Sequence, residues 1–115
     1  MKTLIKSALL LLLVTALIGC GSDVSSVDLV QRDGLYYEKF SDVPFTGKVT
    51  GLDKGLIKNG KREGAWVLYW ENGQLMTKGN YKNGKKDGLW VYYFDDGGFN
   101  ASWSGTFKNG VKISD

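Results

Sequence analysis

The fold is decided by two copies of one unit: KGLIKNGKREGAWVLYWENG at residues 54–73 and KGNYKNGKKDGLWVYYFDDG at residues 78–97. The copies are offset by 24 residues, and eleven of the twenty aligned positions are identical. A partial third copy, GTFKNG, follows at residues 105–110, and a degenerate copy precedes them around residues 34–47. Agreement of this density predicts an architecture built by repeating one supersecondary unit.

Each unit has the composition of a β-hairpin. The run LWVYYF at residues 89–94 is aromatic and β-branched, as is most of its counterpart at residues 65–70, and glycines bound both. Asn-Gly pairs are turn signals, because both residues tolerate the positive φ of tight hairpins; they lie at residues 59–60, 72–73, 83–84 and 109–110. We therefore expect an all-β fold, with about six or seven antiparallel strands in a meander from residue 35 to 111.

The predicted core is a ladder of large side chains at the repeated aromatic positions. Equivalent residues of successive repeats lie two strands apart, or about 9.6 Å, so Trp66 and Trp90 should not touch. The strand between them has to fill the gap, with either Leu75 or Tyr81. No segment after residue 20 has the helical period of an element that would cover a face of the sheet. The single sheet therefore either twists or rolls up, or leaves an aromatic face open. The repeat core is expected to comprise Trp66, Tyr69, Tyr81, Trp90, Tyr93 and Phe107.

The repeat pattern is similar to that of a known family. Gly-x-Trp-x-x-Tyr-x-x-x-Gly, followed by Gly-x-(Tyr/Phe)-Lys-Asn-Gly, resembles MORN repeats of the bacterial variant type over residues 34–112. The resemblance implies an antiparallel array of β-hairpins. For function it implies a phospholipid binder or a protein scaffold, as proposed for eukaryotic relatives, or an antitoxin, as some bacterial relatives are labelled. The poor first copy and a two-residue insertion after Gly97 depart from the regular pattern.

Residues 1–20, MKTLIKSALLLLLVTALIGC, have the organisation of a bacterial signal peptide. Two lysines form a positive n-region, and the apolar run at residues 8–18 is shorter than the roughly 20 residues of a transmembrane helix. The ending Leu-Ile-Gly-Cys at residues 17–20 resembles a lipobox, which implies cleavage before Cys20 and attachment of diacylglycerol to its thiol. The alternative is an ordinary signal peptide with a chance cysteine near its cleavage site.

The chain then divides into three parts. A lipoprotein signal peptide occupies residues 1–19, the lipidated Cys20 and a flexible Ser- and Asp-rich tether extend to residue 33, and the MORN-variant repeat domain occupies residues 34–115. The signal peptide leads us to expect an exported lipoprotein of the bacterial cell envelope. Its lipid would hold it firmly in the membrane, because each buried CH₂ contributes about 0.8 kcal/mol to anchoring. Gly21 follows the cysteine where enteric bacteria use Asp for inner-membrane retention, so the resemblance favours the outer membrane of a Gram-negative cell.

Charge and composition argue against several classes of function. The 15 basic and 12 acidic residues give a formal charge of +3, and removal of Lys2 and Lys6 leaves 13 against 12, or +1. This balance, with export, argues against nucleic-acid binding. The chain has no histidine, and its one cysteine is assigned to the lipid, so catalysis and metal binding lack their usual side chains. The adjacent Asp95 and Asp96 suit hydrogen bonds within a turn better than a catalytic pair. We expect no enzyme and no cofactor.

Two candidate binding surfaces follow from the repeat. Lysine-rich turns would line up along one edge of the sheet, with the acidic turns at residues 71–73 and 95–97 opposite. Each cation near an anionic surface contributes on the order of 1 kcal/mol to binding. The alternative is that these lysines serve only solubility, with their charge diluted by Glu63 and Asp87. The candidate basic edge comprises Lys58, Lys61, Arg62, Lys82, Lys85, Lys86 and Lys108. The candidate contact aromatics, which vary between repeats, are Trp70, Phe94 and Trp103.

The expected function is a non-catalytic binding or scaffold module whose partner is another envelope protein. One alternative is direct binding of an anionic lipid, glycan or other envelope polymer through the basic edge. Another is an antitoxin or immunity protein of a toxin pair. An open sheet edge could also pair with a second copy or accept a strand from a partner.

Overall fold

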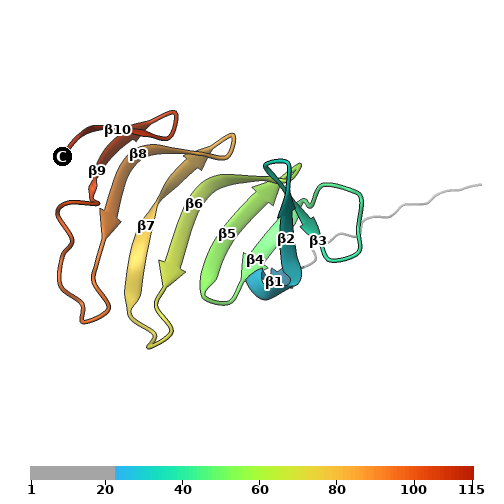
Figure 1. Cartoon of the computed structure of the whole chain (residues 1–115), viewed down its shortest axis with the longest axis horizontal. Helices are drawn as coiled ribbons and strands as arrows, with labels where there is room; N and C mark the ends of the chain where they lie inside the picture. The colour runs from blue at the N-terminus through green and yellow to red at the C-terminus, as the bar shows by residue number, and fades with distance from the viewer. Residues whose placement is uncertain (1–22) are drawn as a thin grey trace, which may run out of the picture.

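A computed structural model describes residues 23–115, which form one large β-sheet with a small hairpin at its N-terminal end (Figure 1). Eight strands form the sheet in the order β1-β4-β5-β6-β7-β8-β9-β10, and β2 pairs with β3 alone. Within these residues, no helix is long and apolar enough to cross a bilayer. The elements are β1 (Asp23–Ser25), a 3-10 turn η2 (Ser26–Asp28), β2 (Leu29–Arg32), β3 (Leu35–Glu38), β4 (Gly47–Thr50), β5 (Asp53–Lys58), β6 (Lys61–Tyr69), β7 (Leu75–Lys82), β8 (Lys85–Tyr92), β9 (Gly105–Lys108) and β10 (Val111–Ser114).

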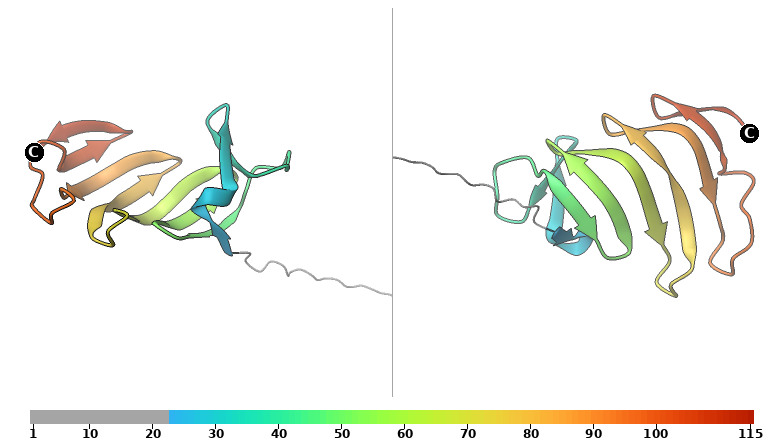
Figure 2. Two further views of the ribbon diagram at one scale, coloured as in Figure 1. Left: turned by 60° about the horizontal axis from the view of Figure 1, so that its bottom comes forward. Right: turned by 180° about the vertical axis from the view of Figure 1, so that it is seen from behind.

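The all-β prediction is confirmed, and the strands from β4 to β10 form an antiparallel meander of seven strands. The sheet twists without closing on itself, and the β2–β3 hairpin rises out of its plane (Figure 2). The proposed signal peptide and Cys20 lie outside the described residues. The sheet therefore has two broad faces, and the side chains on each decide what can bind there.

The flexible tether predicted up to residue 33 is wrong from Asp23 onward. Strand β1 pairs in parallel with β4, where Val24 lies opposite Val49, and β2 pairs with β3. Val24 is buried in the core and Leu29 packs against it. Strands this short bury few side chains, so they contain too few apolar residues to form a recognisable alternating pattern. The surrounding serines and aspartates therefore made the segment resemble a flexible tether.

Four tight turns share one backbone geometry at the same end of the strands. In each, both central residues have positive φ, as a type I′ hairpin requires. The three Asn-Gly turns have φ values of 51–52° for Asn and 81–83° for Gly; they are Asn59-Gly60, Asn83-Gly84 and Asn109-Gly110. Asp33-Gly34, with φ of 51° and 81°, forms the fourth and joins β2 to β3. Asn72-Gly73 lies instead in a longer connection, where Gly73 has positive φ and Asn72 does not.

A tryptophan ring covers a glycine of the preceding strand in each of the two full repeats. Trp66 packs over Gly55 and Trp90 over Gly79, and both tryptophans are 1% exposed. Each indole N–H donates to the carbonyl of the residue after that glycine, at 2.9 and 3.0 Å respectively. The same contact at both positions explains why the glycine and the tryptophan are identical in the two copies.

Tyr81 fills the gap between the two tryptophans, as one of the two predicted side chains. Its ring meets Trp66 edge to face at 6.2 Å and Trp90 at 5.0 Å, measured between ring centroids. Phe107 is partly buried against the same cluster. Tyr92, which was not among the residues predicted in the core, is also buried there. We call the side of the sheet that carries these five rings the aromatic face.

Tyr69 and Tyr93 were predicted in the core, and this is wrong. Both are half-buried and lie outside the buried cluster. Tyr69 stands three residues after Trp66 in one strand, and side chains an odd number of residues apart point to opposite faces. There Tyr69 lies 5.4 Å below the ammonium of Lys54, and Tyr93 meets Phe99 at 6.0 Å.

The insertion after Gly97 is fixed by two buried polar side chains. The backbone N–H of Asn100 donates to the carbonyl of Tyr92 at 2.9 Å, and the amide oxygen accepts from Trp103 N at 3.2 Å. Ser104 Oγ donates to the Asn100 carbonyl at 2.7 Å and accepts from Tyr92 N at 2.9 Å. This network replaces strand pairing where the repeat period is broken.

Candidate functional site

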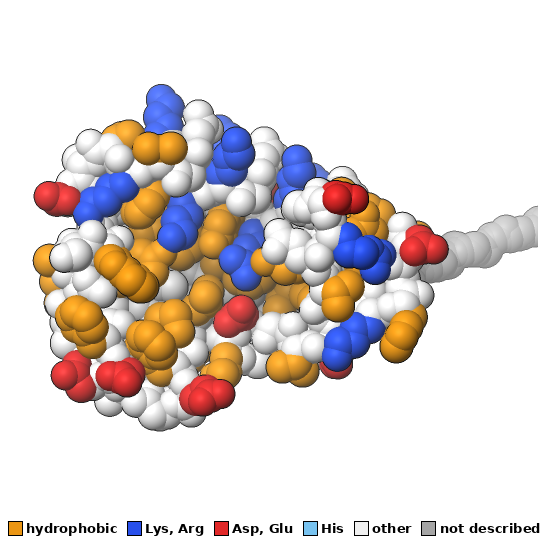
Figure 3. All heavy atoms as spheres, in the orientation of Figure 1, with side chains coloured by type: hydrophobic (Ala, Val, Ile, Leu, Met, Phe, Trp, Pro, Cys, Tyr) orange, Lys and Arg blue, Asp and Glu red, His pale blue; other side chains and the backbone are white. Residues whose placement is uncertain are grey.

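The lysine turns lie at one end of the strands, as the repeat predicted. Figure 3 shows lysines along the upper border of the molecule and acidic side chains along the lower border. Backbone hydrogen bonds hold successive turns in line: Gly84 N donates to Arg62 O and Gly110 N to Lys86 O, each at 3.0 Å. The exposed lysines of this end are Lys58, Lys61, Lys82, Lys85 and Lys108.

Arg62 was predicted on the basic edge, but its side chain turns onto the aromatic face. The guanidinium carbon lies 4.7 Å from the ring centroid of Trp66 and 5.3 Å from that of Tyr81. One guanidinium nitrogen donates to the Tyr81 hydroxyl at 3.0 Å, and another lies 3.8 Å from a carboxylate oxygen of Asp53. The guanidinium group of Arg62 therefore packs against the core rings, as guanidinium groups often do with aromatic side chains.

Lys86, the equivalent residue of the next repeat, departs from the basic edge in the same way. Its ammonium lies 5.1, 4.8 and 5.1 Å from the ring centroids of Trp90, Tyr92 and Phe107. It also donates a hydrogen bond to the Tyr92 hydroxyl. A cation enclosed by three aromatic rings stabilises the fold, and it is poorly placed to meet an anionic surface.

We expect Lys86→Met to lower the free energy of unfolding by about 1 kcal/mol, because the cation–π contacts are lost while the aliphatic stem is kept. The neighbouring Lys85 is exposed in the same turn, so Lys85→Met should change stability by less than about 0.5 kcal/mol. Urea unfolding followed by far-UV circular dichroism measures both. Equal midpoints for the two variants would place Lys86 back on the basic edge.

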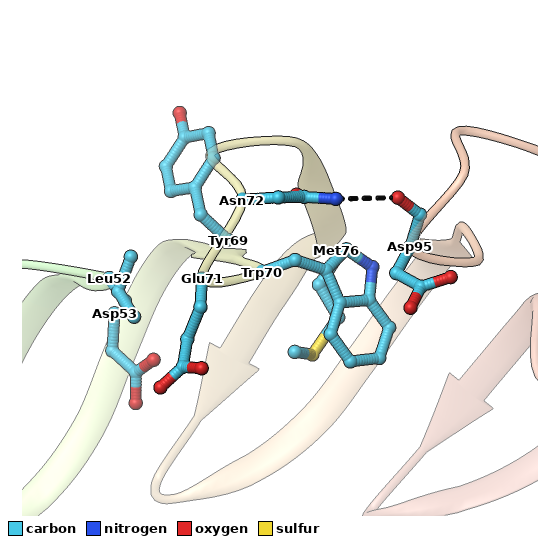
Figure 4. Close-up of a pocket in the computed structure, with 8 residues that line it drawn as sticks. All are labelled: Leu52, Asp53, Tyr69, Trp70, Glu71, Asn72, Met76 and Asp95. Carbon is cyan, nitrogen blue, oxygen red and sulfur yellow. Dashed lines mark hydrogen bonds between the residues drawn. The ribbon is translucent and has the colours of Figure 1, made fainter.

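An open pocket of about 580 Å³ lies at the acidic end of the strands (Figure 4). It forms where the connections β4–β5 and β6–β7 and the turn after β8 lie next to one another. We call it the Trp70 pocket. Leu52, Trp70 and Met76 supply its apolar surface, and Tyr69 lines it with the ring pointing to the other side of the sheet. The remaining lining residues are Asp53, Glu71, Asn72 and Asp95.

Hydrogen bonds between the two acidic turns fix the position of the Trp70 ring. The indole N–H donates to the carbonyl of Tyr93 at 3.2 Å, and the Asn72 amide donates to the carbonyl of Asp95 at 2.7 Å. Asn72 also accepts from Gln74 N at 2.9 Å within its own turn. These bonds span the two turns, so the pocket keeps its shape without a ligand.

Three carboxylates line the pocket that contains the indole of Trp70. Figure 4 shows the Glu71 and Asp95 side chains on either side of the ring, with the Asp53 carboxylate pointing the same way as Glu71. Among residues 23–115, neither Glu71 nor Asp95 forms an ion pair, and Asp53 has the 3.8 Å contact to Arg62. A half-buried aromatic ring flanked by carboxylates suits an ammonium or guanidinium group, through cation–π and charge attraction together.

The predicted contact aromatics fall at different places. Trp70 is half-buried and forms the wall of the pocket. Phe94 is 51% exposed in the neighbouring acidic turn, and Trp103 is 63% exposed on the insertion, edge to face with Tyr92 at 5.8 Å. Variation between the copies singled out these rings, but it gave no sign that Trp70 lies in a pocket with three carboxylates from separate parts of the chain.

Asp95 and Asp96 both lie in the turn after β8. Asp96 accepts from the backbone N–H of Gly98 at 2.8 Å, which confirms its predicted role within the turn. Among residues 23–115, no group of three or more His, Cys, Asp or Glu side chains could hold a metal ion. The carboxylates beside the Trp70 indole provide negative charge next to an aromatic ring.

Comparisons of the chain with protein-family models, curated proteins and solved structures gave no match. The lysine turns and the Trp70 pocket are therefore the features that bear on function.

Proposed function

We propose that the chain is a lipid-anchored lipoprotein of the bacterial envelope, whose MORN-like repeat domain is a non-catalytic module that binds another envelope component. The Trp70 pocket carries the proposal. It combines an aromatic wall with Glu71 and Asp95, and it is held open by hydrogen bonds between turns. A pocket of this kind recognises a lysine or arginine side chain of a partner protein.

The proposed anchor is the lipid on Cys20. Residues 17–20 read Leu-Ile-Gly-Cys, and strand β1 begins at Asp23, three residues after the cysteine. A lipid this close in sequence to β1 would hold the domain at the membrane. The nearby partner is then another component of the same envelope, with the outer membrane as the proposed location in a Gram-negative cell.

Crosslinking in intact cells, followed by purification of the tagged, lipidated chain and mass spectrometry, tests the function. We expect one envelope protein to be enriched with the wild type and lost with Trp70→Ala. Cys20→Ala should abolish membrane association, since the anchor requires the thiol. Trp103→Ala is the matched control, because it removes an exposed indole from another part of the surface. Retrieval of the same protein by wild type and Trp70→Ala would rule out the pocket as its binding site.

A second candidate function is binding of an anionic lipid or envelope polymer through the basic edge. The observation that favours it is the alignment of five exposed lysines at one end of the strands. Attraction of this kind fades as salt shortens the Debye length, from about 10 Å at 0.1 M to about 3 Å at 1 M.

For that second function, we expect the triple variant Lys82→Glu, Lys85→Glu, Lys108→Glu to lose salt-sensitive binding to liposomes that contain phosphatidylglycerol. Lys86 is left unchanged because it stabilises the core. A variant with Lys39→Glu, Lys48→Glu and Lys78→Glu has the same net charge with the lysine turns intact, and should keep binding. Absence of wild-type binding at low salt would eliminate this function.

A further inference from the structure

We infer that the Trp70 pocket of one copy receives a lysine turn of a second copy of this chain, so that anchored molecules associate end to end. The inference rests on the proposed binding function and names a partner for its pocket. Three observations carry it: the charges at the two ends of the strands, the spacing of the turns, and the exposure of the groups involved.

The two ends of the strands carry opposite charges. The lysine turns at one end present exposed side chains that include Lys82 and Lys85. The other end presents Glu71, Asp95 and Asp96, all exposed. Among residues 23–115, none of these five side chains forms an ion pair. A second copy placed end to end therefore brings unpaired ammonium groups to unpaired carboxylates.

The turns at the two ends also have matching spacing. Each repeat contributes one lysine turn and one acidic turn, so neighbouring turns of either kind lie two strands apart, or about 9.6 Å. The lysine turns at residues 59–60 and 83–84 can therefore face the acidic turns at residues 70–74 and 94–98 together. A basic segment of unrelated structure would match this spacing only by chance, and this favours a second copy over another cationic partner.

The Trp70 pocket provides the contact that makes the pairing specific. Its apolar surface accommodates the four-carbon stem of a lysine, and the indole face meets the ammonium. Glu71 and Asp95 then stand where the charge arrives. The partner's turn at residues 83–84 is held in place, because Gly84 N donates to the carbonyl of Arg62 in β6 at 3.0 Å, so little order has to be gained on binding.

Sheet twist limits the size of this interface. Adjacent strands rotate by roughly 20–25°, so two copies placed end to end match over the central repeats and diverge beyond them. The contact is accordingly small, and anchoring in one membrane raises the effective concentration that a weak contact needs. Different surfaces meet on the two copies, so the arrangement is head to tail and continues into short chains.

The test uses the full, lipidated chain carrying either of two epitope tags, co-expressed in one cell and purified from detergent-solubilised membranes through one tag. Three variants are compared with the wild type. The lysine-end variant has Lys82→Glu and Lys85→Glu, so its lysine turns become acidic. The acidic-end variant has Glu71→Lys and Asp95→Lys, so its acidic turns become basic. The control has Lys48→Glu and Lys78→Glu. The control lysines are exposed within β4 and β7, away from the turns.

We expect each of the first two variants, paired with itself, to co-purify about tenfold less than wild type, because like charges then meet at the interface. The control pair should match wild type. Co-expression of the lysine-end variant with the acidic-end variant should restore co-purification, because the ends that meet then carry opposite charges again. This restoration also shows that both variants are folded. Association should fall for wild type at about 0.5 M NaCl, where the Debye length is below about 5 Å.

Wild-type recovery from either variant paired with itself, or failure of the mixed pair, would overturn the inference. The crosslinking experiment separates this outcome from failure of the proposed function. If the copies do not associate but a different envelope protein is retrieved through Trp70, the function stands without the inference. If only a second copy is retrieved, the inference stands and binding of another envelope component fails.

Discussion

Gly79→Ala is expected to lower the free energy of unfolding by about 3 kcal/mol, the upper part of the range for overpacking a core. A Cβ at Gly79 would stand 2.2 Å from Cδ2 of Trp90, and the indole cannot retreat because Tyr81 and Lys86 pack on it. Gly55→Ala should behave alike, since its Cβ would meet the Trp66 ring at 2.3 Å. Urea unfolding followed by far-UV circular dichroism measures both.

Gly88→Ala is the matched control for this prediction. Gly88 lies in the next strand with φ of +86°, and a Cβ there meets nothing within 4 Å. The substitution therefore costs the left-handed backbone penalty of about 1–2 kcal/mol and no steric clash. If Gly79→Ala proves no more destabilising than Gly88→Ala, then packing of the tryptophan over the glycine does not hold the repeats together.

Trp90→Ala is expected to destabilise the protein by about 3–5 kcal/mol, as truncation of a buried aromatic does. The ring is 1% exposed, it donates to the carbonyl of Asn80, and it packs against Tyr81 and Lys86. Its loss leaves that carbonyl without its indole donor and opens the middle of the aromatic face. Trp103→Ala provides the comparison, because that ring is 63% exposed.

The change in Trp103→Ala should stay below about 1 kcal/mol, as for a surface substitution with one ring contact. Thermal unfolding by calorimetry is the suitable measurement, because both variants alter the tryptophan fluorescence. Similar melting temperatures for the two variants would show that the aromatic face is not the core of the protein.

The sequence predicted the fold class and the central contact of the core because both depend on local periodicity. Two copies at a fixed offset placed Trp66 and Trp90 two strands apart, and strand spacing alone then required a side chain between them. Of the two predicted candidates, Leu75 and Tyr81, it is Tyr81 that fills the gap. The Asn-Gly pairs likewise carry their conformation in their residue types. These inferences need no knowledge of how distant segments meet.

The errors arose where side-chain direction outweighs residue type. Lys85 and Lys86 are alike in the sequence, yet one lies in solvent and the other among three rings, because alternate residues of a strand face opposite sides. The same alternation removes Tyr69 from the core, and it could have been applied to the sequence. The pairing of β1 with β4 could not have been predicted from the sequence, since a three-residue strand is too short to show an alternating apolar pattern.

The Trp70 pocket was beyond sequence reasoning for a different reason. Its carboxylates come from the start of strand β5 and from two separate connections, and its shape depends on hydrogen bonds between turns, such as that from Asn72 to Asp95. Trp70 was singled out because it differs between copies, which says that a ring is free to vary but gives no indication of its surroundings.

The packing of each tryptophan over the glycine of the strand before it gives this protein a built-in unit of length. A gene duplication that inserts one further 24-residue copy would recreate the same contact at the new junction, so the core needs no redesign. Each added copy brings one more lysine turn and one more acidic turn. The number of contact points, and with it the avidity of the surface, can therefore evolve through recombination of the gene while every individual contact stays the same.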